Sequence, residues 1–311
     1  MTAASEAPAA GTADRAGVAA LGLRARFWRS EELRGLTLIS PTFLYALLLL
    51  LTPILVIIAF SFWTQSYLDI DHTPTLKNYR EAWTDPLYRT LMFRSLGVSA
   101  LVTLITVVLA YPMAYYLSFH VTHRKALWLF LITIPFWTSY LLRVFAWKII
   151  LGYNGVVNST FLELGIISAP MEFLLYNVNS VVITLAHAWA PFAILPIFVS
   201  LEKIDRSLLE AATDLGDSPV MRFLRVTLPL SLPGIIAASL IVFIPTVGDY
   251  VTPRLVGGKD GLMIANMIQI QFGKANNWPL GAALAISTMI IVTAASLMFV
   301  GLMRQLTTRF R

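Results

Sequence analysis

Six apolar segments divide this chain, and each is long enough to cross a lipid bilayer. They lie near residues 36–62, 95–118, 126–151, 180–201, 228–249 and 280–303. A helix rises about 1.5 Å per residue, so roughly 20 apolar residues cover the hydrocarbon core. Helices satisfy their own backbone polar groups, as a lipid-exposed segment must. The expected fold is therefore an all-α, polytopic membrane bundle of six transmembrane helices.

The composition supports a membrane protein and excludes several other classes. Hydrophobic residues make up 57% of the chain and charged residues only 13%, against about 25% charged in soluble domains. The absence of cysteine excludes disulfides and thiolate metal sites. The four histidines show no ligand spacing, so no metal site is expected. The net charge of +6 is explained by basic residues that flank the spans.

The N-terminal region is polar and rich in alanine. We expect residues 1–30 to form a disordered cytoplasmic tail. The first apolar segment follows RARFWRSEELR, is a full span long and lacks a convincing cleavage site, so it should remain as an anchor. The transmembrane domain is expected over residues 31–311, with its core at about 91–305.

Basic residues predict the orientation of the spans. If the N-terminus is cytoplasmic, 14 of the 23 Lys and Arg residues lie in cytoplasmic segments, which leaves 9 for the outer side. Both termini and the loop around residue 210 are therefore expected inside. The 14 residues are Arg15, Arg24, Arg26, Arg29, Arg34, Arg124, Lys125, Lys203, Arg206, Arg222, Arg225, Arg304, Arg309 and Arg311.

Proline occurs in five of the six segments. Proline removes a backbone hydrogen bond and kinks a helix, which is tolerated where neighbouring helices or water satisfy the freed carbonyl. Each one alone reads as an ordinary membrane-helix proline, but together they favour a transporter or channel over a simple anchor. They are Pro41, Pro53, Pro112, Pro135, Pro191, Pro196, Pro233 and Pro245.

The stretch LLEAATDLGDSP, residues 208–219, predicts a short capped helix between the fourth and fifth spans. Ser207 and Glu210 have the spacing of a capping box. Gly216 can supply the left-handed residue that ends the helix. Ser218 with Pro219 then starts a second helix, which is expected to stop before the Leu-Pro pair at 228–229.

One side of this predicted helix is apolar. Leu208, Ala211, Ala212 and Leu215 recur at the spacing of one helical face. A helix of two turns is unstable alone, so the face needs a partner. The alternative is a re-entrant loop that packs on its own bundle.

The same residues resemble the EAA loop of bacterial ABC-importer permeases. That loop reads EAA, three residues, G, nine residues, I-x-LP, and Val226 here replaces the isoleucine. The resemblance implies a cytoplasmic coupling helix that sits in a groove on an ATP-hydrolysing subunit. The residues it assigns to coupling are Glu210, Ala211, Ala212, Gly216, Leu228 and Pro229.

Three further segments, 78–96, 135–158 and 255–283, resemble spermidine/putrescine permeases. The resemblance implies a subunit of the bacterial cytoplasmic membrane that imports a small cation, with a polyamine as the expected cargo. The implied partners are a second homologous permease, an ATPase dimer and an external solute-binding protein. Relatives carry other amines, opines or phosphonate compounds, and whether the two permeases are identical stays open.

The chain itself carries no signature of an enzyme. GGKDG at 257–261 lacks the first glycine and the Ser/Thr of a phosphate loop. The chain is therefore expected to bind no cofactor, with ATP and Mg on the partner ATPase. An ion-coupled secondary transporter is the alternative from another class, but the spans lack a chain of ionisable groups and the sequence shows no duplicated half.

A polyamine favours carboxylates and aromatic faces along its path. The candidate residues are Asp249, Tyr250, Trp137, Tyr140 and Trp189. A solvated carboxylate and an interfacial aromatic belt are the alternative interpretations. Arg143 and Lys148 would repel a polycation unless they reach the interface or pair with Asp249.

Overall fold

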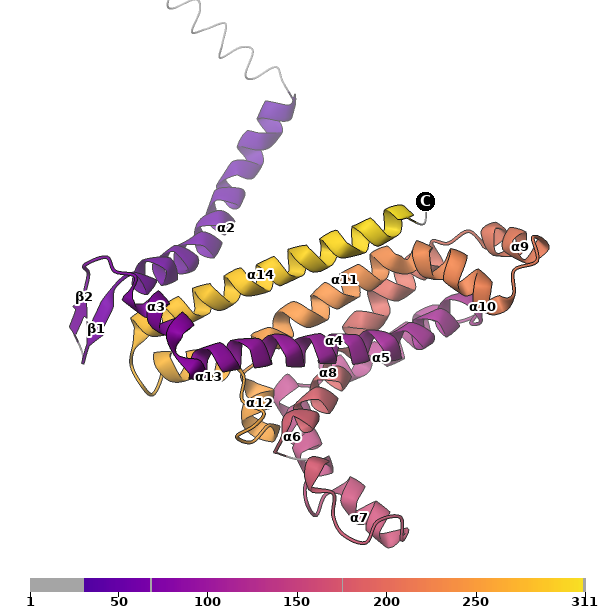
Figure 1. The fold of residues 1–311 in the computed structure, drawn as a ribbon. Helices are drawn as coiled ribbons and strands as arrows, with labels where there is room; N and C mark the ends of the chain where they lie inside the picture. The colour runs from indigo at the N-terminus through magenta and orange to yellow at the C-terminus, as the bar shows by residue number, and fades with distance from the viewer. Residues whose placement is uncertain (1–30, 68, 175, 310–311) are drawn as a thin grey trace, which may run out of the picture. The chain divides into compact units, whose positions relative to one another are not determined.

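The computed structural model describes residues 31–67, 69–174 and 176–309, and it is mostly helical (Figure 1). The described residues up to Ile57 form one compact unit and those from Ile58 onward form a second. The expected tail at residues 1–30 lies outside the described residues. The helical character confirms the expected fold class.

The described elements alternate long helices with short ones. A small antiparallel hairpin, β1 (Thr64–Ser66) and β2 (Asp69–Asp71), places Thr64 opposite Asp71. The helices are α2 (Glu31–Ser61), α3 (Lys77–Thr84), α4 (Pro86–Phe119), α5 (Lys125–Trp137), α6 (Tyr140–Ile150), α7 (Val156–Glu163), η1 (Glu172–Leu174), α8 (Val178–Glu202), α9 (Arg206–Asp214), α10 (Pro219–Arg222), η2 (Phe223–Thr227), α11 (Leu228–Val247), α12 (Val251–Val256), α13 (Ile264–Phe272) and α14 (Trp278–Arg309).

Five described helices are long and apolar enough to cross a membrane. They are Thr37–Ser61, Pro86–Phe119, Val178–Glu202, Pro219–Val247 and Trp278–Gln305. The sixth expected span, near 126–151, is not one helix. It consists of α5 and α6, which bend by 85° at a short break. The prediction of six spans therefore holds if this bent pair counts as one span. The expectation of a continuous helix over 126–151 was wrong.

The core of the second unit is built around α8. This helix packs against α4 and α11, and 61% of its most apolar window is buried. Leu185 and Ile197 of α8, Val102 of α4 and Val242 of α11 are all fully buried. α9 follows one end of α8, and α12 follows the far end of α11, so they lie at opposite ends of the bundle (Figure 1).

Candidate functional site

The loop between α8 and α11 contains the short helix that the sequence predicts. Its N-cap is Asp205, whose side chain accepts a hydrogen bond from the backbone N–H of Ser207 at 3.0 Å. The predicted capping box of Ser207 and Glu210 is wrong, because Ser207 already lies in the first turn of α9. A carboxylate at the cap satisfies a free amide and suits the positive end of the helix dipole.

Asp205 should make the start of α9 sensitive to pH. The Ser207 backbone and side-chain hydrogen bonds hold the pKa of the Asp205 carboxyl below its usual value. Since this pKa is depressed in the folded chain, its contribution to stability is complete above the unfolded pKa. It is lost as the pH falls through the lower folded value.

We therefore expect Asp205→Ala to speed hydrogen exchange at the backbone amides of residues 206–214. Ser207→Ala should have a clearly smaller effect, because the carboxylate remains as the cap. Hydrogen–deuterium exchange measured at neutral and acidic pH checks both variants. Faster exchange in Ser207→Ala than in Asp205→Ala would restore the predicted capping box.

The apolar face of α9 is open over most of its length. Leu208 is 47% exposed and Leu215 is 88% exposed. Ala211 is exposed too, and only Ala212 is buried against the rest of the chain. A re-entrant loop packed on its own bundle would bury this whole face. Only Ala212 is buried, so the structure does not support that alternative. The other small and apolar side chains remain accessible to a partner surface.

Gly216 ends α9 in the left-handed conformation that the sequence predicts. Its φ is +88°, where a side chain would be strained. The N–H of Gly216 donates to the carbonyl of Thr213 at 2.9 Å, and the N–H of Asp217 donates to the carbonyl of Ala212 at 3.0 Å. These bonds satisfy carbonyls at the helix end. The Ser218 hydroxyl then accepts a backbone N–H at the start of α10, as predicted.

The second helix of the loop does not stop before Leu228 and Pro229. Pro219 begins α10 as expected, but the chain continues through the π-helical turn η2 directly into α11. The N–H of Leu228 bonds to the carbonyl of Phe223, five residues back. Pro229 has no N–H and would crowd a regular α-helical turn, and a wider turn accommodates it. The prediction of a stop was therefore wrong.

Glu210 lines a cavity of about 390 Å³ between α9 and the end of α4, with both charged and apolar side chains around it. Arg206, Arg222 and Tyr115 line the same cavity. Arg222 is tied to the Thr213 hydroxyl at 2.8 Å, whereas Glu210 is exposed. The carboxylate can therefore reach a partner without breaking the loop.

An ion pair that the sequence analysis missed supports this end of the bundle. Lys125 Nζ lies 2.7 Å from Glu202 Oε1, which joins the start of α5 to the end of α8. Ser118 of α4 donates its hydroxyl to Glu202 at 3.1 Å and accepts Lys125 Nζ on its carbonyl at 3.0 Å. Both charges are partly exposed, so the pair contributes about 1 kcal/mol or less. The sequence signal that could have revealed this ion pair is Glu202, an acidic residue at the end of an apolar span.

At the opposite end, a buried arginine organises the break between α5 and α6. The Thr138 hydroxyl donates to the Pro135 carbonyl at 2.7 Å, which competes with regular helix bonding. Arg143 donates to the carbonyls of Phe136 at 3.3 Å and Thr138 at 3.2 Å, and to Ala188 of α8 at 3.3 Å. A cation is favoured at a helix C-terminus. Arg143 therefore caps α5 from the following helix and ties the break to α8.

This arrangement corrects the hypothesis that Arg143 or Lys148 pairs with Asp249. Neither forms an ion pair with it in the part of the chain that the structure describes. Arg143 is buried within the protein. Its charge is directed at backbone carbonyls, which explains how a buried guanidinium is tolerated in a span.

Tyr140 and Asp249 connect two helix breaks. Tyr140 is the first residue of α6, and Asp249 lies between α11 and α12. Tyr140 Oη donates to Asp249 Oδ2 at 2.5 Å and lies 2.6 Å from Thr252 Oγ1. Since the phenol has one proton, Thr252 acts as the donor in the second bond. Asp249 Oδ1 accepts the Val251 N–H at 2.8 Å. Both Tyr140 and Asp249 are half-buried.

The other three candidates for the substrate path do not join this pair. Trp137 is 79% exposed and Tyr250 is 44% exposed. Trp189 packs against Phe192 with ring centroids 5.4 Å apart. Its Nε1 is buried without a hydrogen-bond partner in the described residues. Among the five predicted residues, the structure thus brings together only Tyr140 and Asp249.

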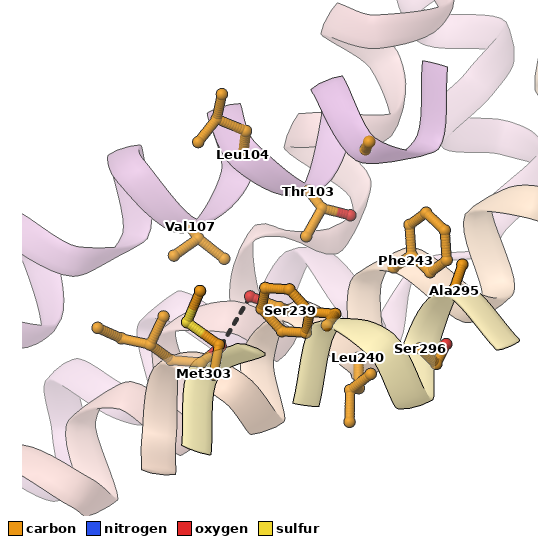
Figure 2. Close-up of a pocket in the computed structure, with 12 residues that line it drawn as sticks. Thr103, Leu104, Val107, Ser239, Leu240, Phe243, Ala295, Ser296 and Met303 are labelled. Atoms are coloured by element: carbon orange, nitrogen blue, oxygen red, sulfur yellow. Dashed lines mark hydrogen bonds between the residues drawn. The ribbon is translucent and has the colours of Figure 1, made fainter. Parts of the chain in front are cut away.

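An apolar cavity of about 390 Å³ lies between α4, α11 and α14 (Figure 2). The hydroxyls of Thr103 and Ser239 bond to carbonyls of their own helices, at 2.7 Å to Ser99 and 2.8 Å to Ile235. None of the 12 residues that line the cavity is charged. Its chemistry therefore does not suit an ammonium group.

These features define a class of protein. Apolar spans surround a buried central helix, an exposed capped helix lies at one end, and broken helices with a carboxylate lie at the other. In the described residues no group of His, Asp or Glu side chains could hold a metal. Together they describe the membrane subunit of a transport system.

The chain belongs to the family described as binding-protein-dependent transport system inner membrane components, whose model matches residues 75–311. This confirms the recognised family and the role of the chain as a transport permease component. Members are components of the inner membrane, as expected for the location of this chain.

Similar curated proteins match along most of their length. The chain is 38% identical to the spermidine/putrescine transport system permease protein PotB of Haemophilus influenzae, over 84% of this chain and 91% of that protein. PotB of Escherichia coli is also 38% identical, over 80% and 90%. The E. coli inner membrane ABC transporter permease protein YdcU is 32% identical, over 86% and 88%.

Solved structures share the fold. A chain of a bacterial ABC transporter involved in the import of the acidic polysaccharide alginate superposes with a TM-score of 0.70 and 16% identity, over 91% of this chain and 98% of that one. A second structure of an alginate ABC transporter, in complex with a pentasaccharide-bound periplasmic protein, gives 0.70 and 15% identity over 91% and 96%. At these identities the likeness concerns the fold.

Proposed function

We propose that this chain is the transmembrane permease subunit of an ATP-binding-cassette importer that moves a polyamine, such as putrescine or spermidine, into the cell. The observation that carries this proposal is the 38% identity to PotB over 84% of the chain. The half-buried carboxylate of Asp249 gives a cation a group of opposite charge at the α12 end. The alternatives are another amine, an opine or an aminophosphonate as cargo.

The proposed assembly contains an ATPase dimer, a second homologous permease and an external solute-binding protein. The exposed face of α9 supports the ATPase contact, since Leu208 is 47% exposed and Leu215 at the C-cap is 88% exposed, on a helix too short to be stable alone. ATP and Mg would be held by the ATPase. The solved alginate transporter with a periplasmic protein supports the binding-protein contact by analogy of fold.

The substrate class is tested on the purified solute-binding protein by calorimetry. We expect micromolar or tighter binding of putrescine or spermidine. If that protein bound a sugar, a sulfonate or a phosphonate and ignored polyamines, the proposed cargo would be wrong. The family membership would be unaffected.

Two single-cysteine variants test the orientation and the ATPase contact, because the chain has no cysteine of its own. Leu215 lies beside α9, and Leu164 follows α7 with 66% exposure. In intact cells an impermeant thiol reagent should label Leu164→Cys and spare Leu215→Cys. A short crosslinker should join only Leu215→Cys to the ATPase.

Leu164→Cys is the matched control, since both positions exchange an exposed leucine outside the long helices. Labelling of Leu215→Cys from outside the cell would reverse the proposed topology. It would also contradict the proposed contact between the ATPase and α9.

A further inference from the structure

We infer that the Tyr140–Asp249 hydrogen bond holds the α12 end of this bundle closed, and that Asp249 meets an ammonium group of the cargo when this bond opens. The second half rests on the proposed function. The first half concerns the chain alone and does not depend on the cargo. We call the hydrogen bond between Tyr140 and Asp249 the outer bridge.

The outer bridge joins two segments that are separate from the long helices. α6 follows the 85° bend after α5, and α12 follows the end of α11 after Asp249. Helix ends of this kind absorb large backbone rotations at few residues. The Tyr140 hydroxyl connects α6 both to Asp249 and to Thr252 of α12, at 2.5 and 2.6 Å. Losing that hydroxyl therefore removes both side-chain links.

Arg143 gives α6 a fixed point when the outer bridge opens. It lies three residues from Tyr140 and bonds to carbonyls of α5, of the break and of α8. None of these partners belongs to α12. The α6 segment thus remains held to the enclosed core helix, and the movement falls between α6 and α12.

The charge arrangement favours a cation as the group that replaces Tyr140. Asp249 accepts its hydrogen bonds from neutral donors, the phenol of Tyr140 and the backbone N–H groups of Val251 and Thr252. No cation pairs with it in the described residues. An ammonium adds the attraction between opposite charges to its hydrogen bond with the carboxylate, which the neutral phenol does not provide. A primary ammonium can therefore take the place of the phenol at Oδ2.

Gly248 offers a position for a probe beside the outer bridge. It is exposed, and an added Cβ would meet nothing closer than the Pro245 carbonyl oxygen at 3.7 Å, an ordinary contact. Gly248→Cys would be the sole cysteine in the chain. Its rates of modification by a quaternary-ammonium methanethiosulfonate and by a neutral one of similar size measure access and local charge separately.

Tyr140→Phe in the Gly248→Cys background should raise the labelling rate by both reagents about tenfold, because a hydrogen bond to a charged group is lost. Tyr111→Phe is the matched control. Its hydroxyl also bridges two spans, lying 2.9 Å from Ser231 Oγ of α11, but away from the two breaks. It should leave the rates unchanged. Equal rates in Tyr140→Phe and Tyr111→Phe would overturn the closure.

Asp249→Asn tests the second half in the same background. It should lower the ratio of the cationic to the neutral labelling rate about tenfold, because the local attraction of cations is lost. An unchanged ratio would show that the carboxylate does not draw cations to this end. A binding protein that ignored polyamines would remove the proposed cargo and leave both labelling results standing, so the two failures are distinguishable.

Discussion

Replacing Gly216 by proline should abolish solute uptake while the chain still inserts into the membrane in normal amounts. Proline fixes φ near −65°, whereas Gly216 requires +88°. The turn that orients α9 against the spans cannot form with proline. Gly216→Ala should cut uptake about tenfold, because a left-handed L-residue costs roughly 1–2 kcal/mol. Space is not the cause, since an added Cβ meets nothing within 4 Å.

Gly165→Ala is the matched control for Gly216→Ala. Gly165 also has a positive φ, +67°, and open space around its Cβ position. It follows α7, at the far end of the bundle from α9. Its replacement should strain a turn to a similar degree and leave most of the uptake. Normal uptake in Gly216→Pro would show that this turn is not needed for coupling.

Glu210→Lys should also stop uptake without preventing insertion. The charge reversal adds a third cation to Arg206 and Arg222 in the cavity beside α9, where Asp214 would be the remaining carboxylate, and the excess of like charge disfavours the loop. Uptake of labelled polyamine, normalised to the amount of chain in the membrane, measures this effect. Transport at the normal rate would show that this carboxylate is dispensable for coupling.

Arg143→Met should destabilise the chain severely, with little properly assembled protein. The substitution keeps an apolar stem and leaves the carbonyls of Phe136, Thr138 and Ala188 without their donor. The bond to Ala188 is buried and the other two are partly buried, and a buried group left unsatisfied costs about 1–3 kcal/mol. We expect a drop in the midpoint of thermal unfolding in detergent, read by tryptophan fluorescence. Arg143→Lys should recover only part of the loss, because an ammonium cannot span several carbonyls.

Lys148→Met is the matched control on the same helix. Lys148 makes no side-chain hydrogen bond or ion pair in the described residues, so its loss should shift the midpoint little. If Arg143→Met unfolded at the same temperature as Lys148→Met, the capping role of Arg143 would be wrong.

The sequence predicted most of the fold because the strongest signals were local. Long apolar runs predicted where the spans lie, but two of the observed helices begin well before the expected starts, at Pro86 rather than 95 and at Pro219 rather than 228. The glycine turn was predictable because few residues other than glycine adopt a positive φ at low cost, and Gly216 does so at +88°. Pro219 at the first position of α10 was predictable for a similarly local reason.

The misses arose where two local rules compete. Asp205 and Ser207 are both favourable N-cap residues, and the helix begins after Asp205, whose carboxylate is the cap. Pro229 signals a helix end, but a π turn lets the helix continue through it. Pro135 signals a kink, yet the helix breaks three residues later, at Thr138. The Thr138 hydroxyl donates a hydrogen bond to the Pro135 carbonyl.

The outer bridge depends on contacts that no local pattern contains. Tyr140 and Asp249 are 109 residues apart in the chain. Both were candidates by residue type, but so were Trp137 and Tyr250, which remain exposed. Only the packing of α6 beside α12 separates the pair from the others. The role of Arg143 was missed for the same reason, since its partners are backbone carbonyls.

The central claim is that this chain moves a polyamine inward by coupling to ATP hydrolysis. The most direct measurement is uptake of labelled spermidine into proteoliposomes that contain the chain with its second permease and ATPase, and with the loaded binding protein outside. The account predicts uptake only when ATP is enclosed in the lumen, and none with an imposed proton or sodium gradient alone. Uptake driven by such a gradient without ATP would contradict it.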